Sequence, residues 1–256
     1  MGSLGTVLGV WAHPDDETYL SAGLMALARD AGDRVVVVTA TRGELGTTDP
    51  DRFPPEVLAP LRDEELRRAL AAIGVEEHHQ LGLADGGLDR YDWSLASAVI
   101  GHIVHEVEPD TIVTFGPDGI TGHPDHRAVS VWATQAWRLA APRARLLYAT
   151  VTGVDDIDRD LGVYEPGYPV LTPPGDVAVA IELSGDLLAR KRAALAAHAS
   201  QTASLAALLG EERYLSWIAN ESFREHRPVR SSGGDRRLRR PRRRAGVHLG
   251  GASARR

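Results

Sequence analysis

Short apolar segments alternate along this chain with longer segments in which apolar residues recur every three or four positions. The run Val35-Val36-Val37-Val38 is uninterrupted and β-branched, which is typical of a strand buried on both faces in a parallel sheet. In Glu17–Ala31 the apolar residues follow helical spacing instead, and Gly32 is placed to end the helix. The two periodicities therefore predict which segments form strands and which form helices.

The whole chain gives an alternation of such elements. Strands are predicted at Thr6–Trp11, Arg34–Thr39, Glu77–Leu81, Thr111–Phe115, Arg145–Val151 and Val177–Leu183. Helices are predicted at Glu17–Ala31, Pro54–Ile73, Ser94–Val107, His126–Leu139, Asp186–Leu209 and Glu211–Phe223. We therefore expect a layered α/β fold with a mostly parallel sheet. Asp155–Gly175, rich in Asp, Gly and Pro, is predicted to be a surface excursion.

The composition is typical of a soluble globular protein. The chain has 256 residues, of which 43% are hydrophobic and 25% are charged, enough for one sizeable core. No apolar run approaches the ~20 residues that span a membrane, and no basic stretch precedes an apolar segment near the N-terminus. We therefore expect a cytoplasmic protein without membrane association. There is no cysteine, so a metal would have to be held by His, Asp or Glu.

Charge is distributed unevenly along the chain. Residues 228–256 contain ten arginines and one aspartate, a net of +9, and residues 1–227 carry a net of −15, which together give −6. The basic segment lacks apolar periodicity, so we predict one folded domain over 1–227 and a disordered Arg-rich tail over 228–256. The acidic domain argues against nucleic-acid binding, although such a tail can bind phosphate non-specifically. The sequence does not indicate the oligomeric state, so a homo-oligomer is left as an alternative to a monomer.

Two short segments rich in His and Asp follow predicted strands. His13-Pro14-Asp15-Asp16-Glu17 comes after the first strand, and His123-Pro124-Asp125-His126 comes soon after Thr111–Phe115. In open α/β sheets, ligands bind beyond the carboxyl ends of the strands. The two segments are 110 residues apart in sequence, yet this topology can bring them to one crevice.

Each segment offers two candidate metal ligands three positions apart, a spacing that places side chains on one face of a helical turn. His13, Asp16 and His126 would form a His-His-carboxylate set. Three protein ligands leave a position open for water, as catalytic zinc requires, and ferrous iron suits the same donors. Zinc bound there would lower the pKa of a bound water to ~7 and supply a hydroxide nucleophile.

Three other residues of these segments are candidates for catalytic roles. Asp15 adjoins a ligand and points elsewhere, which makes it a candidate general base. His123 is placed to donate a hydrogen bond to a developing oxyanion, and Asp125 is placed to orient one of the histidines. Either segment alone is more often a turn or a helix start, because Asp is a common N-cap. The interpretation as a site therefore rests on the pairing of the two segments.

The paired motifs resemble those of the LmbE-like, or PIG-L, family of zinc-dependent N-deacetylases. The resemblance covers roughly the first 225 residues, and the paired motifs are specific for the family. It implies a Rossmann-like three-layer αβα fold and the hydrolysis of an acetamide, typically on a 2-acetamido sugar. It further implies zinc binding by His13, Asp16 and His126, general-base catalysis by Asp15, and stabilisation of the tetrahedral intermediate by His123 with Asp125 as its partner.

Four residues in other family-like stretches are predicted substrate contacts. Arg62, Glu44 and Asp85 are candidates for contacts to a sugar or its hydroxyl groups, with an exposed salt bridge or a helix cap as the alternative for each. His198 begins a His-x-x-Gln element that resembles one near the family's C-terminus. It equally fits a packed surface histidine.

The sequence thus predicts a metal-dependent hydrolase that removes an N-acyl group from a small-molecule, sugar-like substrate. An amidase acting on a larger conjugate, of the mycothiol-conjugate type, shares the core motifs and is left open. A non-catalytic α/β binding module is disfavoured, because no glycine-rich phosphate loop follows the first strand.

Overall fold

The structure is a computed structural model that describes residues 3–153 and 161–226. Its elements, in chain order, are β1 (Val7–Trp11), α1 (Asp16–Asp30), β2 (Val35–Thr41), α2 (Pro55–Ala72), β3 (Glu77–Leu83), η1 (Leu88–Arg90), α3 (Trp93–Val107), β4 (Thr111–Phe115), α4 (Pro124–Ala140), β5 (Arg145–Thr150), η2 (Pro174–Asp176), β6 (Val179–Glu182), α6 (Gly185–Ala197), α7 (Ala199–Leu209), α8 (Glu211–Ile218) and β7 (Asn220–Glu225). The predicted tail, 228–256, lies outside the described residues, so the domain boundary stays a prediction. None of the described helices is long and apolar enough to cross a membrane.

The strands form a seven-stranded sheet in the order β3-β2-β1-β4-β5-β7-β6. The five strands β3, β2, β1, β4 and β5 are parallel to one another, whereas β7 is antiparallel to both β5 and β6. Every residue of β1, β2 and β4 is buried, as expected for strands covered on both faces. The predicted α/β fold with a mostly parallel sheet is confirmed.

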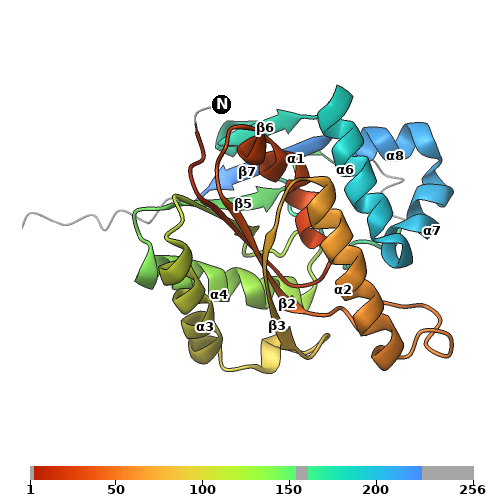
Figure 1. The fold of residues 1–256 in the computed structure, drawn as a ribbon, viewed down its shortest axis with the longest axis horizontal. Coiled ribbons are helices and arrows are strands. Elements are labelled where there is room, and N and C mark those ends of the chain that lie inside the picture. The colour runs from red at the N-terminus through yellow and green to blue at the C-terminus, as the bar shows by residue number, and fades with distance from the viewer. Residues whose placement is uncertain (1–2, 154–160, 227–256) are drawn as a thin grey trace, which may run out of the picture. The chain divides into compact units, whose positions relative to one another are not determined.

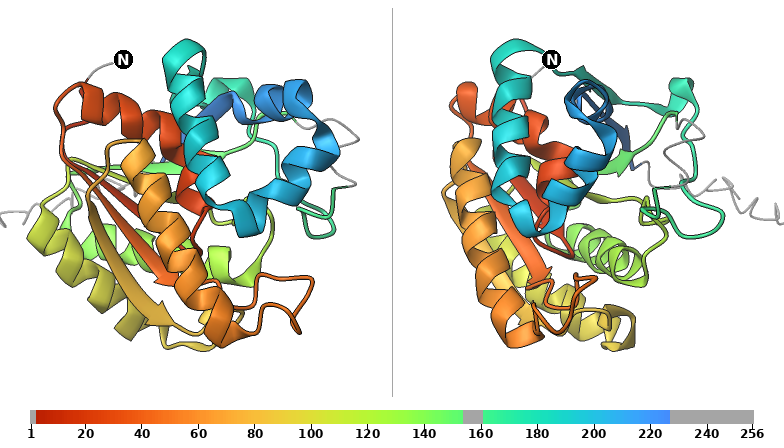
Figure 2. Two further views of the ribbon diagram at one scale, coloured as in Figure 1. Left: turned by 45° about the vertical axis from the view of Figure 1, so that its right-hand side comes forward. Right: turned by 90° about the vertical axis from the view of Figure 1, so that its right-hand side faces the viewer.

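Helices cover both faces of this sheet (Figures 1 and 2). α1 and α2 pack with α6 on one face, and α3 and α4 pack together on the other. The change of face follows from the strand order. α1 and α2 connect strands in the direction from β1 to β3, whereas α4 connects β4 to β5 in the opposite direction, and right-handed crossovers place those helices on opposite faces. The expected three-layer αβα arrangement results.

The point at which the direction changes lies between β1 and β4. These strands are neighbours, with Val7 aligned to Thr111, yet the helices that follow them cover opposite faces. The chain therefore diverges at their carboxyl ends, which is where open α/β sheets bind ligands. Both His/Asp motifs begin at this point.

The prediction of two C-terminal helices is partly wrong. The helix predicted over Asp186–Leu209 is divided at His198 into α6 and α7. The helix predicted over Glu211–Phe223 ends at Ile218, and the following residues form the antiparallel strand β7. Glu221 and Phe223 of β7 are buried, so the burial there has a two-residue period. Periodicity does not distinguish a helix from a strand over such short segments.

Candidate active site

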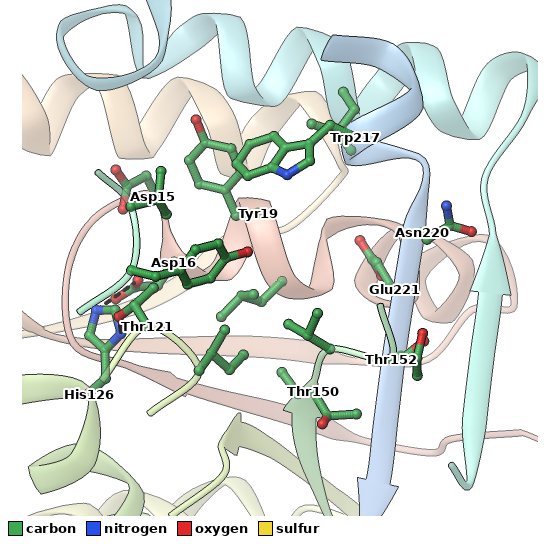
Figure 3. Close-up of a pocket in the computed structure, with 18 of the residues that line it drawn as sticks. Asp15, Asp16, Tyr19, Thr121, His126, Thr150, Thr152, Trp217, Asn220 and Glu221 are labelled. Carbon is green, nitrogen blue, oxygen red and sulfur yellow. Dashed lines mark hydrogen bonds and ion pairs between the residues drawn. The ribbon is translucent and has the colours of Figure 1, made fainter. Parts of the chain in front are cut away.

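The two His/Asp segments meet at the carboxyl ends of β1 and β4 (Figure 3). His13 to Asp16 lead from β1 into α1, while His123 is the N-cap of α4. Figure 3 shows Asp15 and Asp16 of the first segment close to His126 of the second. Pro124 occupies the first turn of α4, where a missing N–H costs no helical hydrogen bond. The fold therefore brings together the residues that the sequence assigns to one site.

His13, Asp16 and His126 direct their donor atoms at one point. His13 Nδ1 lies 3.2 Å from His126 Nε2 and 3.5 Å from Asp16 Oδ2, and His126 Nε2 lies 3.3 Å from Asp16 Oδ1. Ligands ~2.0–2.1 Å from a tetrahedral zinc ion are about 3.3–3.4 Å from one another. The distance between the two nitrogens is close to that spacing, and each nitrogen has one of the two Asp16 oxygens at a similar distance. Asp16 Oδ2 also accepts the backbone N–H of His13 at 2.7 Å.

His126 is fixed so that Nε2 faces this point. Its Nδ1 lies 3.1 Å from the carbonyl oxygen of Gly119 and 3.1 Å from Thr121 Oγ1, and its ring stacks on Phe115 with the centroids 4.2 Å apart. A carbonyl oxygen only accepts, so Nδ1 carries the proton and Nε2 presents its lone pair. Burial lowers the pKa of His126 to about 4, although Asp16 opposes the shift. The ring is therefore neutral near pH 7, as a metal ligand must be.

His13 is oriented by two carboxylates on the opposite side of its ring. Its Nε2 lies 3.1 Å from Asp85 Oδ1 and 3.5 Å from Asp125 Oδ2, which favours a proton on Nε2 and leaves Nδ1 for a metal. Burial by itself lowers the pKa of His13. The nearby carboxylates of Asp125, Asp16 and Asp85 outweigh that effect and hold the pKa well above its usual value.

This donor set fits a divalent cation. With both rings neutral, two lone pairs and a carboxylate face one another with no proton between them, an arrangement that is repulsive unless a positive charge is added. Burial raises the pKa of Asp16, but His126 and His13 hold it far below its usual range. A ring nitrogen of His123 also lies within 4.8 Å of those of His13 and His126. The site is thus arranged to attract positive charge.

Asp15 lines the pocket beside the donor set (Figure 3). Burial raises the pKa of its carboxyl to about 6, and the Arg62 guanidinium, 3.3 Å from Oδ2, limits the rise. A carboxyl group with a pKa close to neutrality can both accept and return a proton, as a general base must.

His123 presents a hydrogen-bond donor to the same pocket. Its Nδ1 accepts the backbone N–H of Asp125 at 3.2 Å, which leaves the proton of the neutral ring on Nε2. The Asp125 carboxylate accepts the backbone N–H groups of Gly86 and Leu88 at 2.9 Å each, and it faces His13 rather than His123. The expected pairing of this carboxylate with His123 is therefore corrected, because Asp125 orients His13.

Two of the predicted substrate contacts lie behind the pocket wall. Arg62 is 3% exposed and donates to the carbonyl oxygens of Gly43, at 2.8 Å, and of Pro14. His198 is completely buried, and its Nε2 lies 3.1 Å from Glu17 Oε1. Neither side chain has surface available for a sugar, so a direct contact does not fit these positions.

Glu44 and Asp85 hold their two loops together. Glu44 Oε1 accepts the backbone N–H of Asp85 at 3.0 Å, and Asp85 Oδ2 accepts the backbone N–H of Leu45 at 2.9 Å. Burial raises the pKa of Asp85, but the nearby His13 ring holds it at about 2. A direct sugar contact by either residue stays a prediction.

A pocket of roughly 950 Å³ extends from the donor set toward α8 and β7. Tyr19 of α1 and Trp217 of α8 lie edge to face in its wall, with their ring centroids 5.6 Å apart, and Asn220 and Glu221 line the end away from His126 (Figure 3). The sequence did not indicate that α8 and β7 contribute to this wall, because 211–223 was predicted to be one helix and contains no recognised motif. Val163, within the predicted surface excursion, also lines the pocket.

Comparisons with known proteins bear on this site. The sequence profile described as PIG-L, GlcNAc-PI de-N-acetylase, matches residues 8–137, which contain both motifs. The 1D-myo-inositol 2-acetamido-2-deoxy-alpha-D-glucopyranoside deacetylase of Kineococcus radiotolerans is 33% identical over 247 residues, covering 76% of this chain and 68% of that protein. The protein of the same name from Streptomyces scabiei is 34% identical over 246 residues, covering 76% of each chain. The solved structure of N,N'-diacetylchitobiose deacetylase from Pyrococcus horikoshii shares the fold, with a TM-score of 0.62 at 23% identity, and covers 86% of this chain and 83% of that one.

The fold and the site define an α/β enzyme in which His13 belongs to two groups that could hold a metal ion, one with His123 and His126 and one with Asp85 and Asp125. The chain belongs to the PIG-L, or LmbE-like, family and is an amide-hydrolysing enzyme. The family membership expected from the paired motifs is confirmed, and a non-catalytic binding module is set aside.

Proposed function

We propose that this enzyme removes the N-acetyl group from a 2-acetamido sugar, releasing acetate and a free amine. The observation that carries the proposal is the convergence of His13, Asp16 and His126 beside Asp15 in a pocket. The names of the two curated relatives support the substrate class, since both are deacetylases of a 2-acetamido-2-deoxy-glucopyranoside.

Zinc is the metal that this donor set favours, and ferrous iron accepts the same His and carboxylate ligands. His13 Nδ1, His126 Nε2 and the Asp16 carboxylate would hold it. When bound, the ion polarises the acetyl carbonyl group and makes a water molecule more acidic.

Asp15 and His123 carry the proton chemistry. Asp15 accepts a proton from the water whose oxygen attacks the acetyl carbon, and His123 Nε2–H donates a hydrogen bond to the carbonyl oxygen as charge develops on it. As the C–N bond breaks, the proton on Asp15 passes to the amine nitrogen. One water is consumed, and Asp15 returns to its ionised form.

The surrounding polar residues prepare this geometry. Asp85 and Asp125 hold His13 with its proton on Nε2, and Arg62 keeps Asp15 closer to its ionised state. Glu44 and Asp85, on the loops beside His13, are the candidates for contacts to sugar hydroxyl groups.

The size of the pocket favours a substrate larger than a single sugar. Its volume of roughly 950 Å³ is near the upper end of the ~300–1,000 Å³ usual for small-molecule sites. A second candidate function is therefore an amidase that acts on a larger conjugate with the same catalytic residues.

The test is a substrate comparison with zinc-loaded protein. Glycosides of N-acetylglucosamine with small and large aglycones are compared with glucosamine amides that carry larger acyl groups, and released acid and amine are both measured. The proposal predicts equal amounts of acetate and amine from the N-acetyl substrates. Cleavage of the large amides alone would favour the amidase, and no cleavage of either class would refute the proposed function.

A further inference from the structure

Asp15 has a backbone conformation that side-chain-bearing residues rarely adopt. Its φ is 116° and its ψ is −27°, whereas the residues that follow it form the first turn of α1. Such conformations are strained and persist only where the surroundings hold them. The conformation matters for the reaction proposed above, because it sets where the Asp15 carboxylate lies relative to Asp16.

The backbone of Asp15 is held by a buried carboxylate. Glu17 Oε2 accepts the backbone N–H of Asp15 at 3.0 Å, and Glu17 is completely buried. The turn is also closed by helical hydrogen bonds, since the N–H groups of Thr18 and Tyr19 donate to the carbonyl oxygen of Asp15. Glu17 is therefore the side chain that fixes the N–H side of this residue.

A buried carboxylate requires partners of its own. Glu17 Oε1 accepts Thr18 Oγ1–H at 2.5 Å and faces His198 Nε2 at 3.1 Å. Burial lowers the pKa of His198, but the hydrogen bond with Glu17 outweighs this and raises it. Among the described residues, His198 Nδ1 has no hydrogen-bond partner, so the polar contacts of this ring are all made through Nε2.

We propose that His198 is a positioning residue for Asp15 and acts through Glu17. The hydrogen bonds from His198 to Glu17 and from the Asp15 N–H to Glu17 fix the backbone of the proposed base. Arg62 of α2 contacts the Asp15 carboxylate. The junction between α6 and α7, which is remote from β1 in sequence, thereby sets the geometry of the loop that follows β1. The inference rests on the proposed function only for its kinetic part.

The alternative is that His198 merely packs the α6–α7 junction. Thr202 provides the matched control, because its hydroxyl donates to the carbonyl oxygens of Leu195 and His198 within the same junction and does not touch Glu17. Thr202→Val loosens the junction without altering the hydrogen bonds that connect His198, Glu17 and Asp15. His198→Leu removes the hydrogen bond to Glu17, and His198→Gln places an amide N–H where Nε2 was.

The kinetic test compares these variants alone and in an Asp15→Asn background. Positioning predicts that His198→Leu lowers kcat about 10–100-fold with little change in KM or metal content, that His198→Gln restores most of the loss, and that Thr202→Val has little effect. Because His198 acts through Asp15, His198→Leu should cost less than about 3-fold in the Asp15→Asn background. An equal loss in both backgrounds, or an equal loss with Thr202→Val, would overturn the proposal.

A second readout does not depend on activity. Hydrogen–deuterium exchange of the full chain should show faster exchange of the Asp15 amide in His198→Leu, and near wild-type exchange in His198→Gln and Thr202→Val. Unchanged exchange at Asp15 in His198→Leu would refute the positioning role. If the wild-type protein cleaves no acetamide, the proposed function fails while this measurement still decides the inference.

Discussion

His13 Nδ1 and His126 Nε2 lie 3.2 Å apart, and the other nitrogen of each ring faces an acceptor, the Asp85 carboxylate for His13 and the Gly119 carbonyl oxygen for His126. Each neutral ring therefore keeps its proton on the outer nitrogen and turns a lone pair toward the other. Either a proton or a cation between the rings relieves this repulsion, and the two must compete.

The first prediction concerns this competition. Because the pKa of His13 is well above its usual value, the metal-free site holds an extra proton near pH 7, and a metal must displace it. We expect about one proton to be released per ion bound at pH 7, and the affinity to fall about tenfold per pH unit of acidification. Calorimetry in buffers of different ionisation enthalpy measures the proton count. Binding without proton release would contradict the assigned protonation state of His13.

The second prediction concerns the carboxylates behind His13. Asp125→Asn and Asp85→Asn each remove a charge that holds the His13 proton on Nε2. Each should weaken zinc affinity about 10–100-fold, as measured by competition with a chelator. Asp89→Asn, an exposed residue of the neighbouring turn, is the matched control and should bind zinc like the wild type. Wild-type affinity in both test variants would remove Asp125 and Asp85 from this role.

The third prediction concerns Asp15. Asp15→Asn should lower kcat about 10²–10⁴-fold with metal content unchanged, because the proposed base is lost while the three proposed ligands remain. Asp63→Asn, in an exposed pair with Arg42, serves as the control. A rate within a few-fold of wild type would mean that another group is the base.

The pH profile checks the same role. Burial raises the pKa of Asp15 to about 6 in the metal-free site, and a bound cation lowers it from there. A base must be ionised, so kcat/KM should fall as the pH falls through a midpoint at or below 6. Measurements at saturating zinc separate this effect from metal loss, and the acidic limb should be absent in Asp15→Asn. A midpoint well above 6 would point to a different group.

The fourth prediction concerns stability. Lys191 and Glu221 form a buried pair at 2.8 Å, and they also bind main-chain groups of α1: Lys191 donates to the carbonyl oxygen of Tyr19, and Glu221 accepts the N–H groups of Gly23 and Leu24. Lys191→Met leaves Glu221 buried without its counter-charge, so it should lower the free energy of unfolding by roughly 3–5 kcal/mol.

Urea unfolding measures this change. Arg192 lies on the same helix as Lys191 and forms an exposed pair with Glu211 of α8, so Arg192→Met should have little effect. A Lys191→Met variant as stable as the Arg192→Met variant would show that the buried pair contributes little.

The sequence was sufficient for the parts of the site that lie within the two His/Asp motifs. The continuous apolar run of Val35–Val38 and the motif positions after two strands predicted the parallel sheet and its crevice. The position of both motifs after strands, together with their resemblance to paired family motifs, predicted that His13, Asp16 and His126 would share one site. In the structure β1 and β4 are neighbours, which brings the two motifs together. Their binding of a metal stays a prediction.

Other contacts between segments remote in sequence could not be predicted in this way. His198 lies 181 residues from Glu17, and nothing in the local pattern around either residue indicates the other. Trp217 and Asn220 were placed in one helix because α8 and β7 are too short for their periodicities to differ. Asp125 was expected beside His123, its neighbour in sequence, but the start of α4 turns its carboxylate toward His13.

The most direct test of the account is zinc add-back to chelator-treated protein, with acetate release from an N-acetylated sugar as the readout. Because the three proposed ligands lie close together, activity should be absent without metal and should rise linearly to a plateau at about one equivalent of zinc. His126→Ala should show no such rise. Full activity in the metal-free protein, or an unchanged plateau in His126→Ala, would contradict the assignment of this site.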